Sequence, residues 1–316
     1  MDRITIGFVP RERFSLAARS LACLFERTPE PFRLLVIDGA IPPVYRHEID
    51  RVLAGRPQVD VIRTDHYLTP NQAKNLTIEQ ADGEFLVLLE NDVLVEPGWL
   101  QPLVTACREL PADVATPLLV EGRGRGKVHF DTGLGSIRRS ANGGAPGYEL
   151  VRRHLPPEAY RSMERGLTQT VEVHCLLFRR DVFDRIGPLD EALSTREPVD
   201  LSLTLFAHGV PVVYEPRSVV RFVPPPPVES AERAFFRWVW DIELARQTHD
   251  YLRSKWRSDF PSSMHFVRDR RNHESHLRYR LSRPVVLGAG AVRRVGTRLR
   301  TVLGQSGWVV DGAPKP

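Results

Sequence analysis

The chain has 316 residues, 42% of them hydrophobic and 26% charged, which is ordinary for a soluble globular protein with one large core or two modest ones. Its apolar runs fall short of the roughly 20 residues that span a bilayer, and the N-terminal "MDRITIGFVP" lacks a signal-peptide pattern, so we expect a cytoplasmic protein. The formal net charge of +5 is concentrated near the C-terminus, which is not the arrangement of a dedicated nucleic-acid-binding protein.

The first 110 residues alternate between strand-like and helix-like patterns. Short apolar runs predict strands at residues 4–9, 32–38, 59–64 and 84–90. Helical spacing predicts helices at residues 14–26, 45–53, 70–81 and 97–110, with Pro97 early in the last, where its missing N–H costs nothing. This alternation implies an α/β fold with a mostly parallel sheet covered by helices on both faces.

An acidic residue ends or directly follows three of these four predicted strands, the exception being the strand at residues 4–9. The segments at the strand ends are Pro10–Glu12, Asp38, Asp65 and Glu90–Asp92. Ligands of open α/β sheets bind at the carboxyl ends of the strands, so these segments are candidates for a binding site. The alternative for Glu90–Asp92 is a turn that caps the following helix.

The second half of the chain has a different composition. Residues 121–147 are rich in Gly and Arg, but "GRGRGK" lacks the spacing of a phosphate-binding loop, so we expect a mobile loop over a site. The chain then predicts a strand and short helix in "TVEVHCLLFRRDVFDRIG", and a helix in "VDLSLTLFAHG" that Gly209 ends. One or two strands follow, up to "PPPP", and then one long aromatic-rich helix over residues 229–256.

The C-terminal tail is strongly basic. Residues 253–300 hold 13 Lys and Arg against three acids, a net +10 that leaves −5 for the rest of the chain. Residues 291–303 have the spacing of a basic amphipathic helix, which could contact an anionic membrane surface or dock on its own domain. A solvated arginine-rich segment remains the alternative.

The three cysteines are far apart in sequence, which fits reduced thiols and argues against a disulfide framework or a structural zinc site.

Four blocks of sequence, in order, resemble family 2 glycosyltransferases with the GT-A fold over roughly residues 3–223. The blocks are "IGFVPRER", "LLVIDGA", "NQAKNLTIEQADGEFLVLLENDVLVEPGWL" and "LLFRRDVFDRIGPLDEALSTREPVDLSLTLFAHG". The family pattern A-R-N-x-G … A-x-G … L-D-x-D is matched by Ala73–Asn75, Ala81–Leu86 and Leu89–Asp92. The resemblance implies a GT-A domain at 1–227, with a nucleotide-binding half at 1–118 and an acceptor half at 119–227. A C-terminal helix and basic tail at 228–316 follow.

The resemblance also implies roles on the donor side. A nucleotide-diphosphate sugar is densely anionic, and Mg²⁺ or Mn²⁺ commonly offsets that charge with one or two carboxylates. By resemblance, Asp92 binds the metal, and Glu90 contacts the ribose or orients the metal shell. The remaining donor-side candidates are Asp38 at the base or ribose, Pro10 and Glu12 along the base, Lys74 near the nucleotide, and Asn91 within the acidic motif. A turn acid is the alternative for Asp38, and a solvated helix residue is the alternative for Lys74.

Two departures from the family pattern affect the chemistry. The family takes its general base from the Asp of an E-D pair, and here "REPVD" has Pro198 at that position. We expect Glu197 to be the base, with Asp200 in reserve or in a structural pair, and Pro198 in the first helical turn. Many relatives carry a metal-binding His after the last core strand, where this chain has Arg221 and Phe222. The metal would then rest on Asp92 alone, or Arg221 would neutralise the diphosphate.

His174 is another candidate site residue, although a single His on a strand is more often simply buried.

The resemblance implies an inverting glycosyltransferase that uses a nucleotide-sugar donor. We expect its acceptor, a lipid-linked glycan, polysaccharide, peptide or small molecule, to be held by residues 121–168 and the C-terminal helix. The alternatives are a catalytically silent sugar-nucleotide-binding or scaffold protein and a nucleotidyltransferase. The latter is disfavoured because "FVPRERFSLAA" carries no Gly- and Arg-rich activation motif.

Overall fold

The folded body is an α/β structure that the computed structural model describes for residues 3–11, 13–121, 127–128, 134–142, 145–152, 162–257 and 270. Glu12 and the predicted basic helix at 291–303 lie outside these residues. The expectations of nucleotide contact by Glu12 and membrane contact by that helix therefore stay predictions.

A single sheet of ten strands runs through the described part of the chain. In spatial order its main path is β10 (Gly166–Thr168), β12 (Val212–Phe222), β6 (Val114–Glu121), β11 (Cys175–Arg179), β4 (Phe85–Glu90), β1 (Ile4–Val9), β2 (Arg33–Gly39) and β3 (Val59–Thr64). The short strands β5 (Val93–Val95) and β7 (Lys127–Val128) pair with β12 and β6. The predicted α/β class with a mostly parallel sheet is confirmed, because β4, β1, β2 and β3 pair in parallel as the apolar runs indicated.

Strand β11 runs against both of its neighbours in the middle of the sheet. β11 is inserted between β4 and β6 and is antiparallel to both. Its first residue, Cys175, therefore pairs with Leu89 near the carboxyl end of β4. As a result, the residues that precede β11 in the chain lie beside the acidic segment that follows β4.

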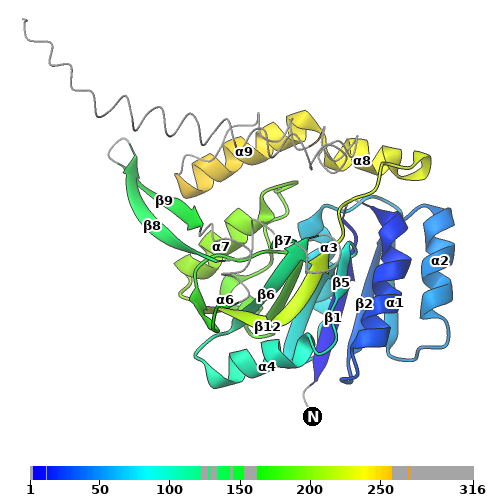
Figure 1. The fold of residues 1–316 in the computed structure, drawn as a ribbon. Helices are drawn as coiled ribbons and strands as arrows, with labels where there is room; N and C mark the ends of the chain where they lie inside the picture. The colour runs from blue at the N-terminus through cyan, green and yellow to red at the C-terminus, as the bar shows by residue number, and fades with distance from the viewer. Residues whose placement is uncertain are drawn as a thin grey trace, which may run out of the picture.

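Helices cover both faces of the sheet (Figure 1). The helices whose side chains share one core cluster with the sheet are α1 (Ala17–Arg27), α2 (Pro43–Leu53) and α4 (Leu100–Glu109). The other face packs against α3 (Pro70–Gln80), α6 (Val182–Ile186) and α7 (Glu197–Ala207). The predicted coverage of both faces is therefore confirmed, and β2 and β4 read as apolar runs because both of their faces are buried.

Two predicted helices differ from the observed ones. The helix expected at 97–110 begins only at Leu100, because Gly98 takes a left-handed φ of +72° and turns the chain after Pro97. The long helix expected at 229–256 is divided into a short 3-10 turn η2 (Ser230–Glu232), α8 (Arg233–Val239) and α9 (Ile242–Trp256). Asp241 causes the second break, since its extended backbone starts α9 and its side chain accepts a hydrogen bond from Leu244 N at 2.9 Å.

The Gly- and Arg-rich segment also contains structure that its composition did not predict. Strands β8 (Gly135–Asn142) and β9 (Ala145–Arg152) form a separate two-stranded antiparallel sheet. The expectation of a loop is wrong for these two stretches, because they pair with each other from Gly135 opposite Arg152 to Asn142 opposite Ala145.

The C-terminal helices lie across the edge of the sheet at which β1 and β4 end (Figure 1). Phe235 and Val239 of α8 belong to the same core cluster as α1 and α4, so α8 is packed onto the body. No described helix is both long and apolar enough to cross a bilayer. Within the described residues the three cysteines are buried and unpaired.

Candidate active site

The carboxyl ends of β1 and β4 carry a buried group of charged side chains, which we call the strand-end cluster: Arg11, Lys74, Glu90, Asp92 and His174. Glu90 is at its centre and is 0% exposed. Its Oε1 accepts from Lys74 Nζ at 2.8 Å and from Arg11 Nη1 at 2.9 Å. Burial opposes the ionisation of Glu90, but Arg11, Lys74 and His174 outweigh it and hold the pKa of this carboxyl below its ordinary value.

The alternative interpretation of Lys74, a helix residue exposed to solvent, does not describe its environment. Lys74 is 2% exposed and forms its ion pair inside the site, because α3 packs against the carboxyl half of β4. The N-terminus of α3 is held by a capping box between Thr69 and Gln72, with Pro70 in the first turn. This cap determines where the first turns of α3, and with them Lys74, stand relative to the sheet.

The second oxygen of Glu90 is a candidate metal ligand. Its Oε2 is buried and, among the residues that the structure describes, accepts no hydrogen bond. One ligand atom from each of Glu90, Asp92 and His174 lies within 4.8 Å of the other two, and all three residues are buried. Two carboxylates and an imidazole suit a divalent ion such as Mn²⁺, so the residues present fit a metal centre.

His174 is oriented by a second carboxylate behind it. Its Nδ1 contacts Glu172 Oε1, while its Nε2 faces Glu90 Oε2 at 4.0 Å. Burial disfavours the imidazolium, but Glu172, Glu90 and Asp92 outweigh it and raise the pKa of His174 to about 9. Metal-binding histidines generally have such a partner on the ring nitrogen that faces away from the metal.

The sequence pattern assigned His174 no role in metal binding, because relatives in the resembled family carry their metal-binding His after the last core strand. The family position for a metal-binding His holds Phe222, and the structure places the His174 ring edge-on against that phenylalanine, 4.8 Å between ring centres. The antiparallel insertion of β11 brings this imidazole there, because His174 directly precedes β11. Arg221 pairs with Glu96 at 3.0 Å, which is a contact outside the strand-end cluster.

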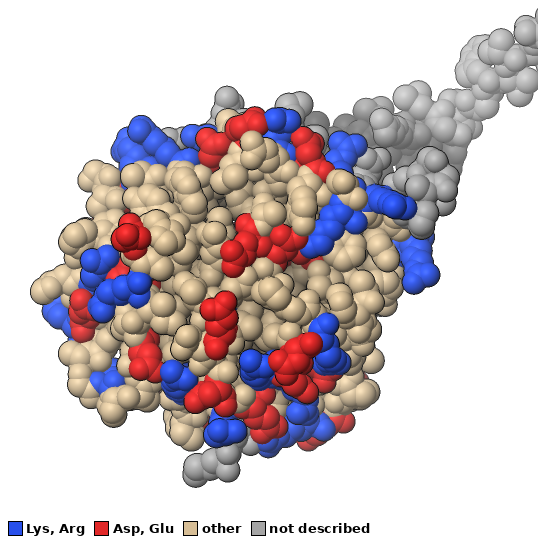
Figure 2. Space-filling model, turned by 180° about the vertical axis from the view of Figure 1, so that it is seen from behind, with Lys and Arg blue, Asp and Glu red and all other residues tan. Residues whose placement is uncertain are grey.

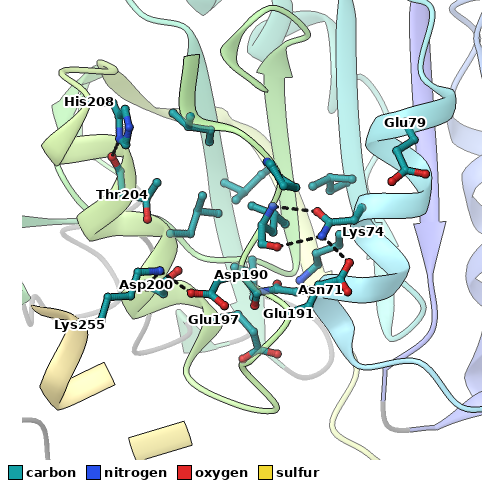
Figure 3. A pocket seen from close by; sticks show the side chains of 18 of the residues that line it. Asn71, Lys74, Glu79, Asp190, Glu191, Glu197, Asp200, Thr204, His208 and Lys255 are labelled. Carbon is teal, nitrogen blue, oxygen red and sulfur yellow. Dashed lines mark hydrogen bonds and ion pairs between the residues drawn. The ribbon is translucent and has the colours of Figure 1, made fainter. Parts of the chain in front are cut away.

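Beside this cluster lies a cavity of about 600 Å³, which we call the α3–α7 cavity (Figure 3). Glu197 and Asp200 reach it from α7, Asn71 and Lys74 reach it from α3, and Lys255 reaches it from the end of α9. Glu197 is the first residue of α7 and is 3% exposed. Its nearest cation is Arg11, with Oε1 and Nη1 3.7 Å apart, so Arg11 links the cavity to the strand-end cluster.

The start of α7 has a local explanation. Arg196 takes a left-handed φ of +64°, which turns the chain into the helix directly before Glu197. Pro198 stands in the first turn, as expected, where a residue without an N–H is tolerated. Pro198 stands where the family has its usual base, and it thus also helps to start α7, whose first residue is Glu197.

Asp200 is held by partners that the resemblance did not include. Its Oδ1 accepts from Trp256 Nε1 at 2.7 Å and forms an ion pair with Lys255 Nζ at 2.8 Å. Lys255 also bridges to Asp190 at 2.6 Å. These contacts agree with the structural reading of Asp200, and they join the end of α9 to α7.

The other predicted donor-side residues lie near the same edge of the sheet but have partners already. Asp38 is 3% exposed, and its carboxylate accepts from Ile41 N at 2.8 Å and from Arg46 Nε at 2.7 Å. Asn91 connects the end of β4 to the segment after β1, since it accepts from Arg11 N and donates to Arg13 O. Pro10 is buried directly after β1. Asp65, in contrast, is on the surface and bonds His66 at 2.8 Å.

Comparisons with known proteins agree with this architecture. The sequence profile described as "Glycosyl transferase family 2" matches residues 11–187. The O-antigen biosynthesis protein RfbC of Myxococcus xanthus is 31% identical over 169 residues, which is 50% of this chain and 12% of that protein. The pre-mycofactocin glycosyltransferase of Mycobacterium tuberculosis is 24% identical over 188 residues, 59% of this chain and 36% of that protein. The chain thus spans well under two thirds of either relative.

Among solved structures, GalNAc-T7, crystallised with UDP, GalNAc and Mn²⁺, superposes with a TM-score of 0.54 at 15% identity. The match covers 86% of this chain and 54% of that one. At this identity the likeness concerns the fold, which is the GT-A arrangement that the sequence resemblance implied.

Proposed function

Because the chain belongs to glycosyl transferase family 2 and has the GT-A fold of a glycosyltransferase, we propose that it moves a sugar from a nucleotide-diphosphate donor to an acceptor hydroxyl, with inversion at the anomeric carbon. The observation that carries this proposal is the position of Glu197. It faces a cavity and lies one arginine away from the buried cluster that fits a metal and a diphosphate.

On the donor side, Glu90, Asp92 and His174 would hold the divalent ion. When bound, the ion supplies positive charge that stabilises the diphosphate as it leaves. Arg11 and Lys74 carry positive charge at the same place and would share that work. Pro10 and Asp38, at the ends of β1 and β2, would lie along the nucleoside. A ribose hydroxyl that bonds Asp38 would have to share its carboxylate with Arg46.

On the acceptor side, the chemistry is a single displacement. The Glu197 carboxylate takes the proton of the acceptor hydroxyl while the hydroxyl oxygen forms a bond to the anomeric carbon. The bond from that carbon to the diphosphate oxygen breaks, and the nucleoside diphosphate leaves with the electron pair. One displacement inverts the anomeric configuration. Asp200 is the weaker candidate for the base, because Lys255 and Trp256 already hold it.

Nucleotide titration of the wild-type protein tests the donor half of this proposal. We expect UDP or GDP to bind in calorimetry, and the affinity to fall when Mn²⁺ is removed with a chelator. ATP is the control, because it carries phosphates and binds metal but is not a nucleotide-sugar product. If neither diphosphate binds, the transferase proposal fails.

Slow hydrolysis of the nucleotide sugar, with water as the acceptor, tests the catalytic half. Metal-dependent release of UDP or GDP from a panel of nucleotide sugars is the expected result. Tight nucleotide binding without any turnover would instead favour a silent sugar-nucleotide-binding protein. Turnover that a chelator leaves unchanged would overturn the role given to the metal.

A further inference from the structure

The α3–α7 cavity has a charge that restricts which acceptor can enter it. We propose that this cavity is the acceptor subsite and that it selects a hydroxyl-bearing acceptor whose part inside the cavity is uncharged or carries an amino group. An acceptor with a phosphate or carboxylate at that place would be rejected. This inference rests on the proposed transferase function, and it adds the chemical class of the acceptor.

The first observation is the sign of the charge around the cavity. Five carboxylates line it, from Glu79, Asp190, Glu191, Glu197 and Asp200, against the two ammonium groups of Lys74 and Lys255. Figure 2, which shows the molecule from behind, has acidic side chains gathered across the middle of that face. The described lining therefore has an excess of negative charge, and a cation entering the cavity gains energy where an anion loses it.

The second observation is that both ammonium groups are already engaged. Lys74 is 2.8 Å from Glu90, and Lys255 lies between Asp190 and Asp200 at 2.6 and 2.8 Å. A phosphate or carboxylate in the cavity would have to take one of these lysines from a carboxylate. The carboxylate left behind would then lack its counter-charge, which is costly at a partly buried site.

The third observation concerns Glu197 itself. Its carboxylate is 3% exposed and lines the cavity, yet within the described residues it accepts no hydrogen bond, and its contact with Arg11 is 3.7 Å long. A buried carboxylate is normally hydrogen-bonded, so this one is placed to accept from a ligand. A hydroxyl or ammonium group can donate that bond, whereas an ionised phosphate or carboxylate cannot.

The far wall of the cavity comes from a segment beyond the family match at 11–187. Trp256 lines the cavity at the end of α9, where its Nε1 donates to Asp200 and its ring packs edge-to-face with Tyr148 of β9, 5.7 Å between centres. Lys255 and Trp256 thus complete the subsite with side chains of this chain's own C-terminal helix. The strongly basic tail would by itself suggest an anionic acceptor, and the cavity has the opposite sign.

Three small probes of the same ring configuration separate the possibilities: D-glucosamine, methyl β-D-glucopyranoside and D-glucuronate. Their dissociation constants would be measured by saturation-transfer NMR on the full chain with UDP and Mg²⁺, at a pH where the amine is protonated. We expect glucosamine to bind most tightly, the methyl glycoside next, and glucuronate least. One unit charge at about 7 Å, with a dielectric constant between about 40 and 80, changes affinity about three- to eightfold.

A charge variant tests whether the cavity causes this order. Glu191→Gln removes one lining charge and retains an oxygen for Asn75 Nδ2, which donates to Glu191 at 2.8 Å. We expect it to narrow the ratio between the glucosamine and glucuronate affinities by about 9- to 60-fold, because the lost charge weakens binding of the amine and strengthens binding of the carboxylate by about three- to eightfold each. Glu48→Gln on the exposed surface of α2 is the matched control, and we expect it to leave the ratio unchanged.

The outcomes are distinct from those of the proposed function. If neither UDP nor GDP binds, the transferase proposal fails and takes this inference with it. If UDP binds but none of the probes does, or glucuronate binds best, the acceptor inference alone is wrong. An equal response of the ratio to Glu191→Gln and Glu48→Gln would show that the lining charge does not select the ligand, which would also overturn it.

Discussion

The strand-end cluster and the α3–α7 cavity are neighbours that hold their charges in opposite ways. In the cluster, Glu90 has two cations in direct contact and is fully buried. In the cavity, Glu197 is equally buried, but its one described cation is 3.7 Å away and it accepts no hydrogen bond within the described residues. The charges of the cluster are thus paired with one another, whereas the cavity holds a carboxylate that accepts no hydrogen bond from the described residues. Binding and catalysis would be divided between them.

The largest expected effect belongs to the cavity. Glu197→Gln removes the proposed base and should lower kcat by about 10²- to 10⁴-fold, the usual contribution of general base catalysis. Nucleotide affinity, measured by calorimetry, should change little, because the cluster is intact. Asp200→Asn is the comparison, and its loss should be smaller, since Lys255 and Trp256 already occupy that carboxylate. Comparable losses in both variants would move the base assignment to Asp200.

The next effect belongs to the cluster. Asp92→Asn should lower turnover by about 10³-fold, because a metal contributes several kcal/mol of charge stabilisation. The defect should also appear in binding, as loss of the Mn²⁺-dependent part of the UDP affinity. Glu96→Gln is a suitable control, since Glu96 follows β5 and pairs with Arg221 rather than with the cluster. A variant of Asp92 that keeps metal-dependent UDP binding would contradict the assignment.

A smaller effect tests the support behind the cluster. Glu172→Gln should weaken Mn²⁺ binding by about 10- to 100-fold, the range typical of a carboxylate that orients a ligating histidine. The measurement is the Mn²⁺ dissociation constant by electron paramagnetic resonance without nucleotide, and Glu172→Asp should recover part of the affinity. The surface pair Asp65 and His66 offers a matched control, Asp65→Asn. Equal affinities in the two variants would remove Glu172 from the metal site.

The smallest effect concerns the connection between α9 and the cavity. Burial disfavours both charged forms, but the ion pair lowers the pKa of Asp190 and raises the pKa of Lys255. Asp190 therefore stabilises the fold above its unfolded pKa of about 4 and loses this effect as pH falls through its lower folded value. Lys255 stabilises the fold below its unfolded pKa of about 10.4 and loses this effect as pH rises through its higher folded value.

Lys255→Met should accordingly increase hydrogen exchange at the end of α9 between about pH 4 and 10, the window in which both groups are charged. The increase should be a few-fold, because partly exposed ion pairs contribute little. Arg246→Met removes exposed ion pairs from the same helix and should have a weaker effect. No difference between the two variants would mean that Lys255 does not anchor α9.

Much of the donor side was predictable from sequence, because its signals are local. Apolar runs predicted β1, β2 and β4, and acids marked the ends of β2 and β4. The block from Lys74 to Asp92 placed an α3 residue near the acidic end of β4. The structure then pairs Lys74 with Glu90 directly. The start of α4 and the break before α9 were missed, because one glycine conformation and one side-chain cap override helical spacing there.

The acceptor side was less predictable, because it depends on contacts between distant parts of the chain. Glu197 was chosen from a single short motif, and no local pattern marks Lys255 or Trp256, which lie more than 50 residues further on. His174 read as an ordinary buried histidine because its partners, Glu90 and Asp92, lie at the end of β4, more than 80 residues earlier in the chain.

By itself, the sequence determined the fold class, the parallel strands whose carboxyl ends carry acids, and the family. These features follow from apolar periodicity and short motifs, which are local properties. Only the tertiary structure decided which groups meet. The antiparallel insertion of β11 brings His174 to Glu90 and Asp92, and the course of α9 brings Lys255 to Asp190 and Asp200. Packing across the whole core sets strand direction and helix docking. No single stretch of sequence therefore predicts these contacts.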